Sequence, residues 1–189
     1  MAWGWMSMLV AMMLPLLASA LQHLHNRSLA RHRSFNIVLF ISAYFFVWMI
    51  AGALMLTTAI TVQIVFVNPS IPVFVALLLA FCWQISPAKQ TCLNRSHTEP
   101  SVTGFGLRSR IDIFKFGITN GFWCAGSCWA LMFIPLFIPH AHLTIMLIVS
   151  LWIWGEALER PAPPQWKWRW PVKAARLAVT QSVQRLRIN

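Results

Sequence analysis

The chain has 189 residues, of which 58% are hydrophobic and 10% are charged, and its formal net charge is +11. A soluble domain of this length has too little interior to bury so much apolar material, so the composition excludes an ordinary soluble domain and predicts a membrane protein. The positive charge does not indicate nucleic acid as a partner, because all 15 Lys and Arg residues lie outside the apolar runs.

The apolar runs predict an all-α, polytopic bundle of about five transmembrane helices. Each run approaches or exceeds the roughly 20 residues that cross a bilayer, and the expected spans cover residues 3–21, 36–64, 71–88, 117–138 and 140–158. Lys and Arg gather in the first and third connections and in the tail. The positive-inside rule then predicts a bacterial inner-membrane protein with its N-terminus outside and its C-terminus in the cytoplasm.

The first three spans differ in their polar content. The first begins without the basic start of a signal peptide, so we expect a retained helix. The second, residues 36–64, is longer than a perpendicular helix requires and predicts tilt or a locally unwound end. The third carries Gln84, which in lipid requires a partner on a neighbouring helix, and Pro87 marks its exit at the cytoplasmic surface.

The fourth and fifth spans lead into a separate tail. The fifth ends near Glu156, which has the spacing to pair with Arg160. Residues 1–160 therefore form the expected transmembrane domain, and residues 161–189 form a basic tail with an amphipathic helix from Val172 onward. Trp and basic residues alternate at the start of this tail and predict contact with the lipid surface: Trp166, Lys167, Trp168, Arg169 and Trp170.

Cys124 and Cys128 lie one helical turn apart in the fourth span. Side chains at this spacing have Cβ atoms about 5 to 6 Å apart, and thiolate–metal bonds are about 2.3 Å long, so two sulfurs can hold one ion. A rise of 1.5 Å per residue brings Met12 and Met13 of the first span to a similar depth. Such soft ligands favour Cu(I), with zinc as the second choice.

The spacing leaves a metal-free reading open. Gly117, Gly121, Ala125 and Cys128 approximate a stripe of small residues, which lets two membrane helices approach closely. Free cysteine also packs as a small hydrophobic residue, and methionine fills gaps between helices. The same residues therefore predict either a soft-metal site or a packing surface.

Three sequence blocks resemble the signature of the predicted metal-binding integral membrane protein family, domain of unknown function 2182. The blocks are MSMLVAMMLP, AFCWQISPAKQTCL and GFWCAGSCWALM, at residues 6–15, 80–93 and 121–132. The resemblance implies a polytopic membrane protein with a metal role, usually copper. It marks Met12, Met13, Cys92, Cys124 and Cys128 as ligands, and it assigns a structural role to Pro15, Gln84, Pro87, Gly126 and Trp129.

Two cysteines of the family pattern are absent from this chain. Ser96 stands where the family has a cysteine after the second block, with His97 beside it as a substitute ligand, and Ser127 stands in place of the first cysteine of a pair. Met8 is a further soft donor near the first block. These departures leave three motif cysteines and three open outcomes: weaker binding, binding that uses methionine or His97 in place of cysteine, or loss of binding in this member.

The leading hypothesis is therefore a membrane protein that binds Cu(I) through Cys and Met and serves metal handling or metalloenzyme assembly. Its expected partners are the lipid bilayer and a metalloenzyme or another membrane subunit. The alternatives are a metal-free structural or assembly subunit and, third, a small transporter. An enzyme is not expected, because no nucleophile and base occur at a suitable spacing. A transporter is disfavoured because the spans hold no Asp, Glu, Lys or Arg of the kind that marks ion paths, apart from Glu156 near the inner end of the fifth.

Overall fold

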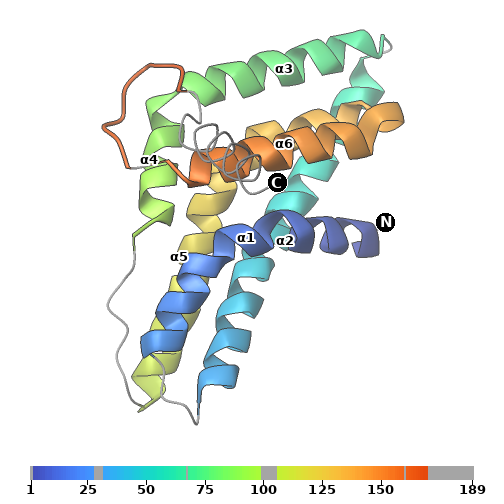
Figure 1. Ribbon diagram of the computed structural model, residues 1–189. Coiled ribbons are helices and arrows are strands. Elements are labelled where there is room, and N and C mark those ends of the chain that lie inside the picture. The colour runs from blue at the N-terminus through green and yellow to red at the C-terminus, as the bar shows by residue number, and fades with distance from the viewer. Residues whose placement is uncertain (1, 28–31, 67, 99–105, 160, 170–189) are drawn as a thin grey trace, which may run out of the picture.

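The structure is a computed structural model that describes residues 2–27, 32–66, 68–98, 106–159 and 161–169. Six α-helices and two short 3₁₀ turns form this part of the chain, which confirms the predicted all-α class (Figure 1). In chain order they are α1 (Ala2–Arg27), α2 (Arg33–Val65), α3 (Ser70–Ile85), α4 (Pro87–Ser96), α5 (Gly106–Phe133), η1 (Ile134–Phe137), η2 (Pro139–Ala141) and α6 (His142–Ala157).

Helices α2 and α5 form the most extensive contact of the bundle. Glycines on α5 make this contact close. A Cβ atom added at Gly117 would lie 2.7 Å from the carbonyl oxygen of Phe40, and one at Gly121 would lie 3.2 Å from that of Tyr44. The two glycines of the predicted small-residue stripe therefore face α2, and the approach of the two backbones depends on the absence of side chains at these positions.

Two prolines coincide with bends in the chain. Pro15 lies inside α1, which bends near its middle in Figure 1, because proline removes a backbone donor and clashes with the preceding turn. Between α3 and α4 the axis turns by 67°. Ser86 accepts a hydrogen bond from the Ala88 amide at 3.1 Å, and Pro87 is at the first position of α4. Pro87 thus starts a further helix where we expected the third span to end.

The predicted count of five spans is not confirmed. Among the described residues, two helical segments are long and apolar enough to cross a membrane, Arg33–Val65 and Leu107–Phe137, and the bent α3–α4 pair would be a third. Helix α6 is apolar but has 16 residues, which span about 24 Å against a hydrocarbon core of about 30 Å. Helix α5 also begins earlier than expected, at Gly106.

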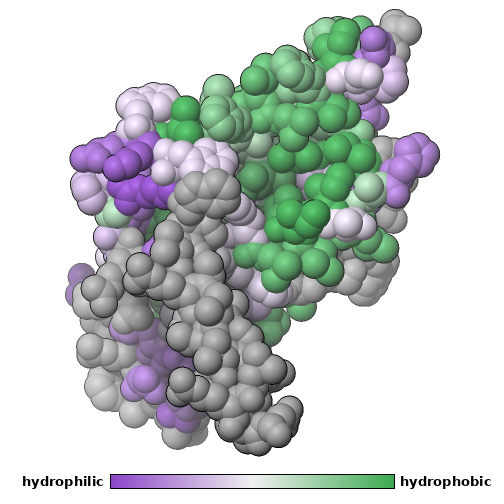
Figure 2. All heavy atoms as spheres, turned by 45° about the horizontal axis from the view of Figure 1, so that its top comes forward, coloured by the Kyte–Doolittle hydropathy of each residue, from purple (hydrophilic) through white to green (hydrophobic). Residues whose placement is uncertain are grey.

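Large apolar side chains are exposed over one broad face of the molecule. Figure 2 shows hydrophobic residues gathered over this face and hydrophilic ones at its ends. Across the described residues, exposed large apolar side chains are frequent on α2, α3 and α6 and include Phe46, Leu54, Ile64, Phe74, Leu77, Leu147 and Ile148. Contiguous apolar surface of this extent marks a region that contacts lipid or another protein.

The tail is described only in its first part. Trp166 and Lys167 are exposed, and Arg169 donates a hydrogen bond to the Pro163 carbonyl at 2.8 Å. Trp168 instead stacks on Phe81, with ring centroids 5.4 Å apart, and lies 5.9 Å from Trp152. Trp170 and the expected amphipathic helix from Val172 lie outside the described residues.

Candidate metal centre

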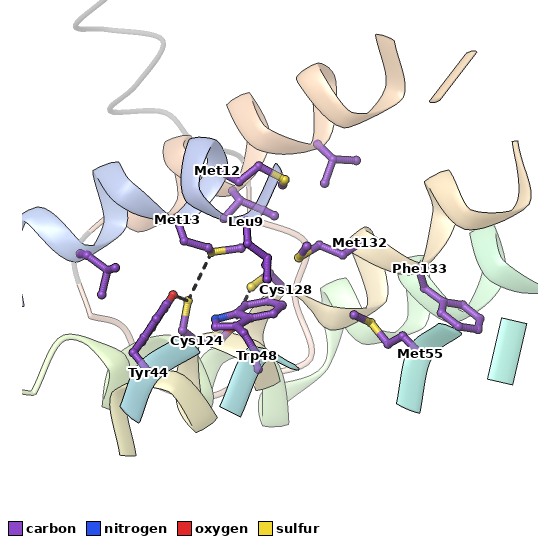
Figure 3. Packing of buried hydrophobic residues seen from close by; sticks show 14 of the residues in the cluster. Leu9, Met12, Met13, Tyr44, Trp48, Met55, Cys124, Cys128, Met132 and Phe133 are labelled. Atoms are coloured by element: carbon purple, nitrogen blue, oxygen red, sulfur yellow. Dashed lines mark hydrogen bonds between the residues drawn. The ribbon is translucent and has the colours of Figure 1, made fainter. Parts of the chain in front are cut away.

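Met13 of α1 and two cysteines of α5, Cys124 and Cys128, belong to one buried cluster beside α2. Met13 of α1 points toward Cys124 of α5 (Figure 3), and their sulfur atoms are 3.9 Å apart. Cys128 follows one turn later on α5. All three side chains are almost inaccessible, with 0% exposure at Met13, 5% at Cys124 and 1% at Cys128. The structure therefore brings together the predicted Cys124, Cys128 and Met13.

The two thiols have different hydrogen-bond partners. Tyr44 of α2 donates its hydroxyl to the Cys124 sulfur at 3.2 Å, and Tyr44 itself is fully buried. The Cys128 thiol donates to the backbone carbonyl of Cys124 at 2.7 Å. The Cys124 sulfur therefore accepts a hydrogen bond from a neighbouring helix, whereas the contact of Cys128 is confined to its own helix.

Two further methionines, Met12 and Met132, are buried in the hydrophobic cluster that contains this centre. Met12 is buried, and its carbonyl accepts a hydrogen bond from the indole of Trp154 at 2.7 Å. Figure 3 shows the Met12 side chain on another side of α1 from that of Met13. Met132, one turn beyond Cys128, is buried in the same cluster. Met8 lies in α1, and its side chain is outside what the structure describes.

A cavity of about 520 Å³ opens beside the two thiols. Its wall includes Cys124, Cys128 and Tyr44, and also His97 and Glu156. Soft and polar groups therefore border the same space. Other polar side chains on its wall are Ser19, Gln22, Ser96, Asn120 and Ser127.

Cys92 is not placed beside Cys124 and Cys128. Its sulfur lies 3.0 Å from the position that a Cβ atom would take at Gly126. Residues on an α-helix are about 100° apart, so Gly126 faces about 200° away from Cys124. No group of three or more His, Cys, Asp or Glu residues with metal-binding geometry occurs in the described ranges. A role for Cys92 as a ligand stays a prediction.

His97 is held by the backbone of two helices. Its Nδ1 atom lies 2.7 Å from the Leu93 carbonyl and its Nε2 atom lies 2.9 Å from the Ala157 carbonyl. The ring thus links the end of α4 to the end of α6. A metal at His97 would have to displace one of these contacts, so its predicted role as a substitute ligand stays untested.

The residues with expected structural roles form contacts between helices. Trp83 of α3 donates to the Gly126 carbonyl at 3.0 Å, and its ring meets that of Trp129 edge to face at 5.2 Å. Gln84 and Lys89 both donate to the Glu156 carboxylate of α6, Lys89 at 2.5 Å. Glu156 therefore pairs with Lys89, whereas Arg160 lies outside the described residues.

Sequence reasoning missed Tyr44 and the partner of Lys89. Tyr44 is the only tyrosine of the chain and stands inside a run without charged residues. A hydroxyl in such a run requires a partner on another helix. This requirement is the sequence signal that could have identified Tyr44. The pairing of Lys89 with Glu156 joins residues 67 positions apart, so no local spacing rule could have found it.

The fold and the site define an all-helical protein with a buried cluster of thiol and thioether groups. A family model described as PpoB2, copper chaperone, matches residues 2–180, and the chain belongs to this family. No curated protein and no solved structure matches the chain. The family is one of copper chaperones, which agrees with the expected copper association and with a protein that is not an enzyme. The membrane setting and the resemblance to domain of unknown function 2182 remain predictions.

Proposed function

We propose that this chain is a membrane-embedded copper chaperone that holds Cu(I) on Cys124, Cys128 and Met13 and delivers it to a copper-dependent protein. Family membership supports the copper part of the proposal. The ligand set rests on the sulfur cluster. Thiolate and thioether sulfur are soft donors that select Cu(I) over hard cations.

The observation that carries the proposal is the 3.9 Å separation between the Met13 and Cys124 sulfurs. If each metal–sulfur bond is about 2.3 Å long, two sulfurs in a trigonal arrangement lie about 4.0 Å apart. Very little movement of α1 against α5 is therefore needed to admit the ion. Cys128 supplies the third sulfur after its thiol leaves the Cys124 carbonyl, which it contacts in this structure.

The exposed apolar face supports the membrane setting. Its side chains lie on α2, α3 and α6, and two of the described helical segments have the length and hydropathy to cross a bilayer. With the positive-inside rule, this arrangement predicts an inner-membrane protein with a cytoplasmic C-terminus. Residues 1–160 would form the embedded domain, and the basic tail would lie on the inner surface.

The metal-free packing role is the second candidate, because Gly117 and Gly121 lie against the α2 backbone. In that case Cys124 and Cys128 would only fill space at the same contact. The two candidates differ in metal content. They can therefore be separated without knowing the recipient protein.

The test is copper content by mass spectrometry on detergent-purified protein that is kept reduced and loaded with Cu(I). We expect about one copper per chain, which is lost in the double variant Cys124→Ser, Cys128→Ser. Cys82→Ser is the matched control, because Cys82 is an exposed thiol on α3, and it should retain copper. Copper absent from the wild type, or retained by the double variant, would overturn the proposed site.

A further inference from the structure

Tyr44 is a buried polar group at the sulfur cluster, and the proposed ligand set does not use it. Its hydroxyl donates to the Cys124 sulfur from a helix that carries no proposed ligand. The ring is 0% exposed and stacks against Phe40, with centroids 6.4 Å apart. The hydroxyl is therefore fixed in direction by packing on α2.

The hydrogen bonds of Cys124 describe the thiol before metal binding. Its sulfur accepts from Tyr44, and its own proton is directed at the Met13 sulfur. When Cu(I) binds, the S–H bond breaks, the proton passes to a base of the aqueous buffer, and a copper–sulfur bond forms on the side that faces Met13. The Tyr44 hydroxyl approaches from another direction and need not move.

We propose that Tyr44 is a positioning residue that stabilises the metal-bound thiolate of Cys124 through its hydroxyl. This inference rests on the proposed function. Hydrogen bonds to an ionised acceptor are about twice as strong as those between neutral groups. The contact of Tyr44 with Cys124 therefore strengthens when the thiol becomes a thiolate, and only this gain contributes to copper affinity.

Because this hydrogen bond strengthens on copper binding, removing the hydroxyl in Tyr44→Phe should lower the affinity for Cu(I). Hydrogen bonds to charged groups exceed neutral ones by an amount that corresponds to about a tenfold change in an equilibrium constant. We therefore expect Cu(I) affinity, measured by competition with a chromophoric Cu(I) chelator, to fall by about tenfold in Tyr44→Phe. The sulfur-to-copper charge-transfer band should also shift. A purely structural role would not move the band of the copper that remains bound.

Ser150→Ala is the matched control. Ser150 is a buried hydroxyl on α6 that donates to the Met146 carbonyl of the same helix at 2.6 Å. Removing this hydroxyl tests whether any lost buried hydrogen bond weakens copper binding through stability. We expect Ser150→Ala to keep wild-type affinity and an unchanged charge-transfer band.

The chain offers a direct probe because Tyr44 is its only tyrosine. Protein that contains ring ¹³C-labelled tyrosine gives a tyrosine NMR signal from this one side chain. We expect Cu(I) to shift that signal in the wild type and to leave it unchanged in Cys124→Ser. If copper binds but neither the signal nor the affinity of Tyr44→Phe changes, the role of Tyr44 is refuted while the proposed function stands. If no copper binds to the wild type, the proposed function itself fails.

Discussion

The ion pair between Lys89 and Glu156 gives the sharpest test of how the helices are held together. The two charged groups are 2.5 Å apart, and their side chains are 6% and 12% exposed. Removing one partner of a buried pair leaves an uncompensated charge and costs about 3 to 5 kcal/mol. For a chain of this size, each kcal/mol lowers the melting temperature by about 2 to 4 °C. We therefore predict that Lys89→Met lowers it by about 6 to 20 °C.

The assay is thermal unfolding of the detergent-purified protein, followed by circular dichroism. Glu156 also accepts a hydrogen bond from Gln84, so the second substitution must keep an acceptor. In the double variant Lys89→Met, Glu156→Gln the charge is gone and the amide oxygen can still accept this bond. We expect this variant to regain most of the loss, and Lys167→Met, at an exposed lysine, to show none. The reasoning would be refuted if Lys89→Met melted within about 2 °C of wild type. It would also be refuted if the double variant melted at a lower temperature than Lys89→Met.

Two further predictions concern the helix contacts and the topology. Gly117→Ala should destabilise the fold by about 1 to 3 kcal/mol, because the new Cβ would meet a backbone oxygen at 2.7 Å. Gly126→Ala should cost less, because its neighbour is the Cys92 side chain, which can rotate. Equal melting temperatures for the two variants would contradict this account. An epitope added at the C-terminus should be protected from protease in right-side-out vesicles, and cleavage there would reverse the proposed orientation.

The helical class and the core of the site could be predicted from the sequence because they depend on local spacing. The second span, expected at residues 36–64, appears as α2, Arg33–Val65. The turn between Cys124 and Cys128 sets the separation of the two thiols. Counting residues along the helices brought Met13 to a depth similar to that of the two cysteines, and the structure places its sulfur 3.9 Å from that of Cys124.

The features that escaped prediction depend on contacts between distant segments or on weak local signals. Helix α4 is polar, so hydropathy does not reveal it, although Ser86 before Pro87 is a capping residue followed by a residue that favours the first helical position. The direction of Cys92 is set by the 67° bend between α3 and α4. The family resemblance marks Cys92 as a ligand, but it does not give the rotation about the helix axis, and this rotation decides which sulfurs can meet.

The copper-binding and packing interpretations involve the same contact between α2 and α5. Gly117 and Gly121 bring the two backbones together, and this closeness lets Tyr44 of α2 reach the Cys124 sulfur of α5. A ligand that binds only the folded state stabilises it in proportion to the logarithm of ligand concentration over Kd. Copper held between α1 and α5 would therefore strengthen the packing that positions its own ligands, and release to a recipient would require those helices to separate at the cluster. In the proposed function the glycines allow the close contact between α2 and α5, and the cysteines bind copper beside that contact.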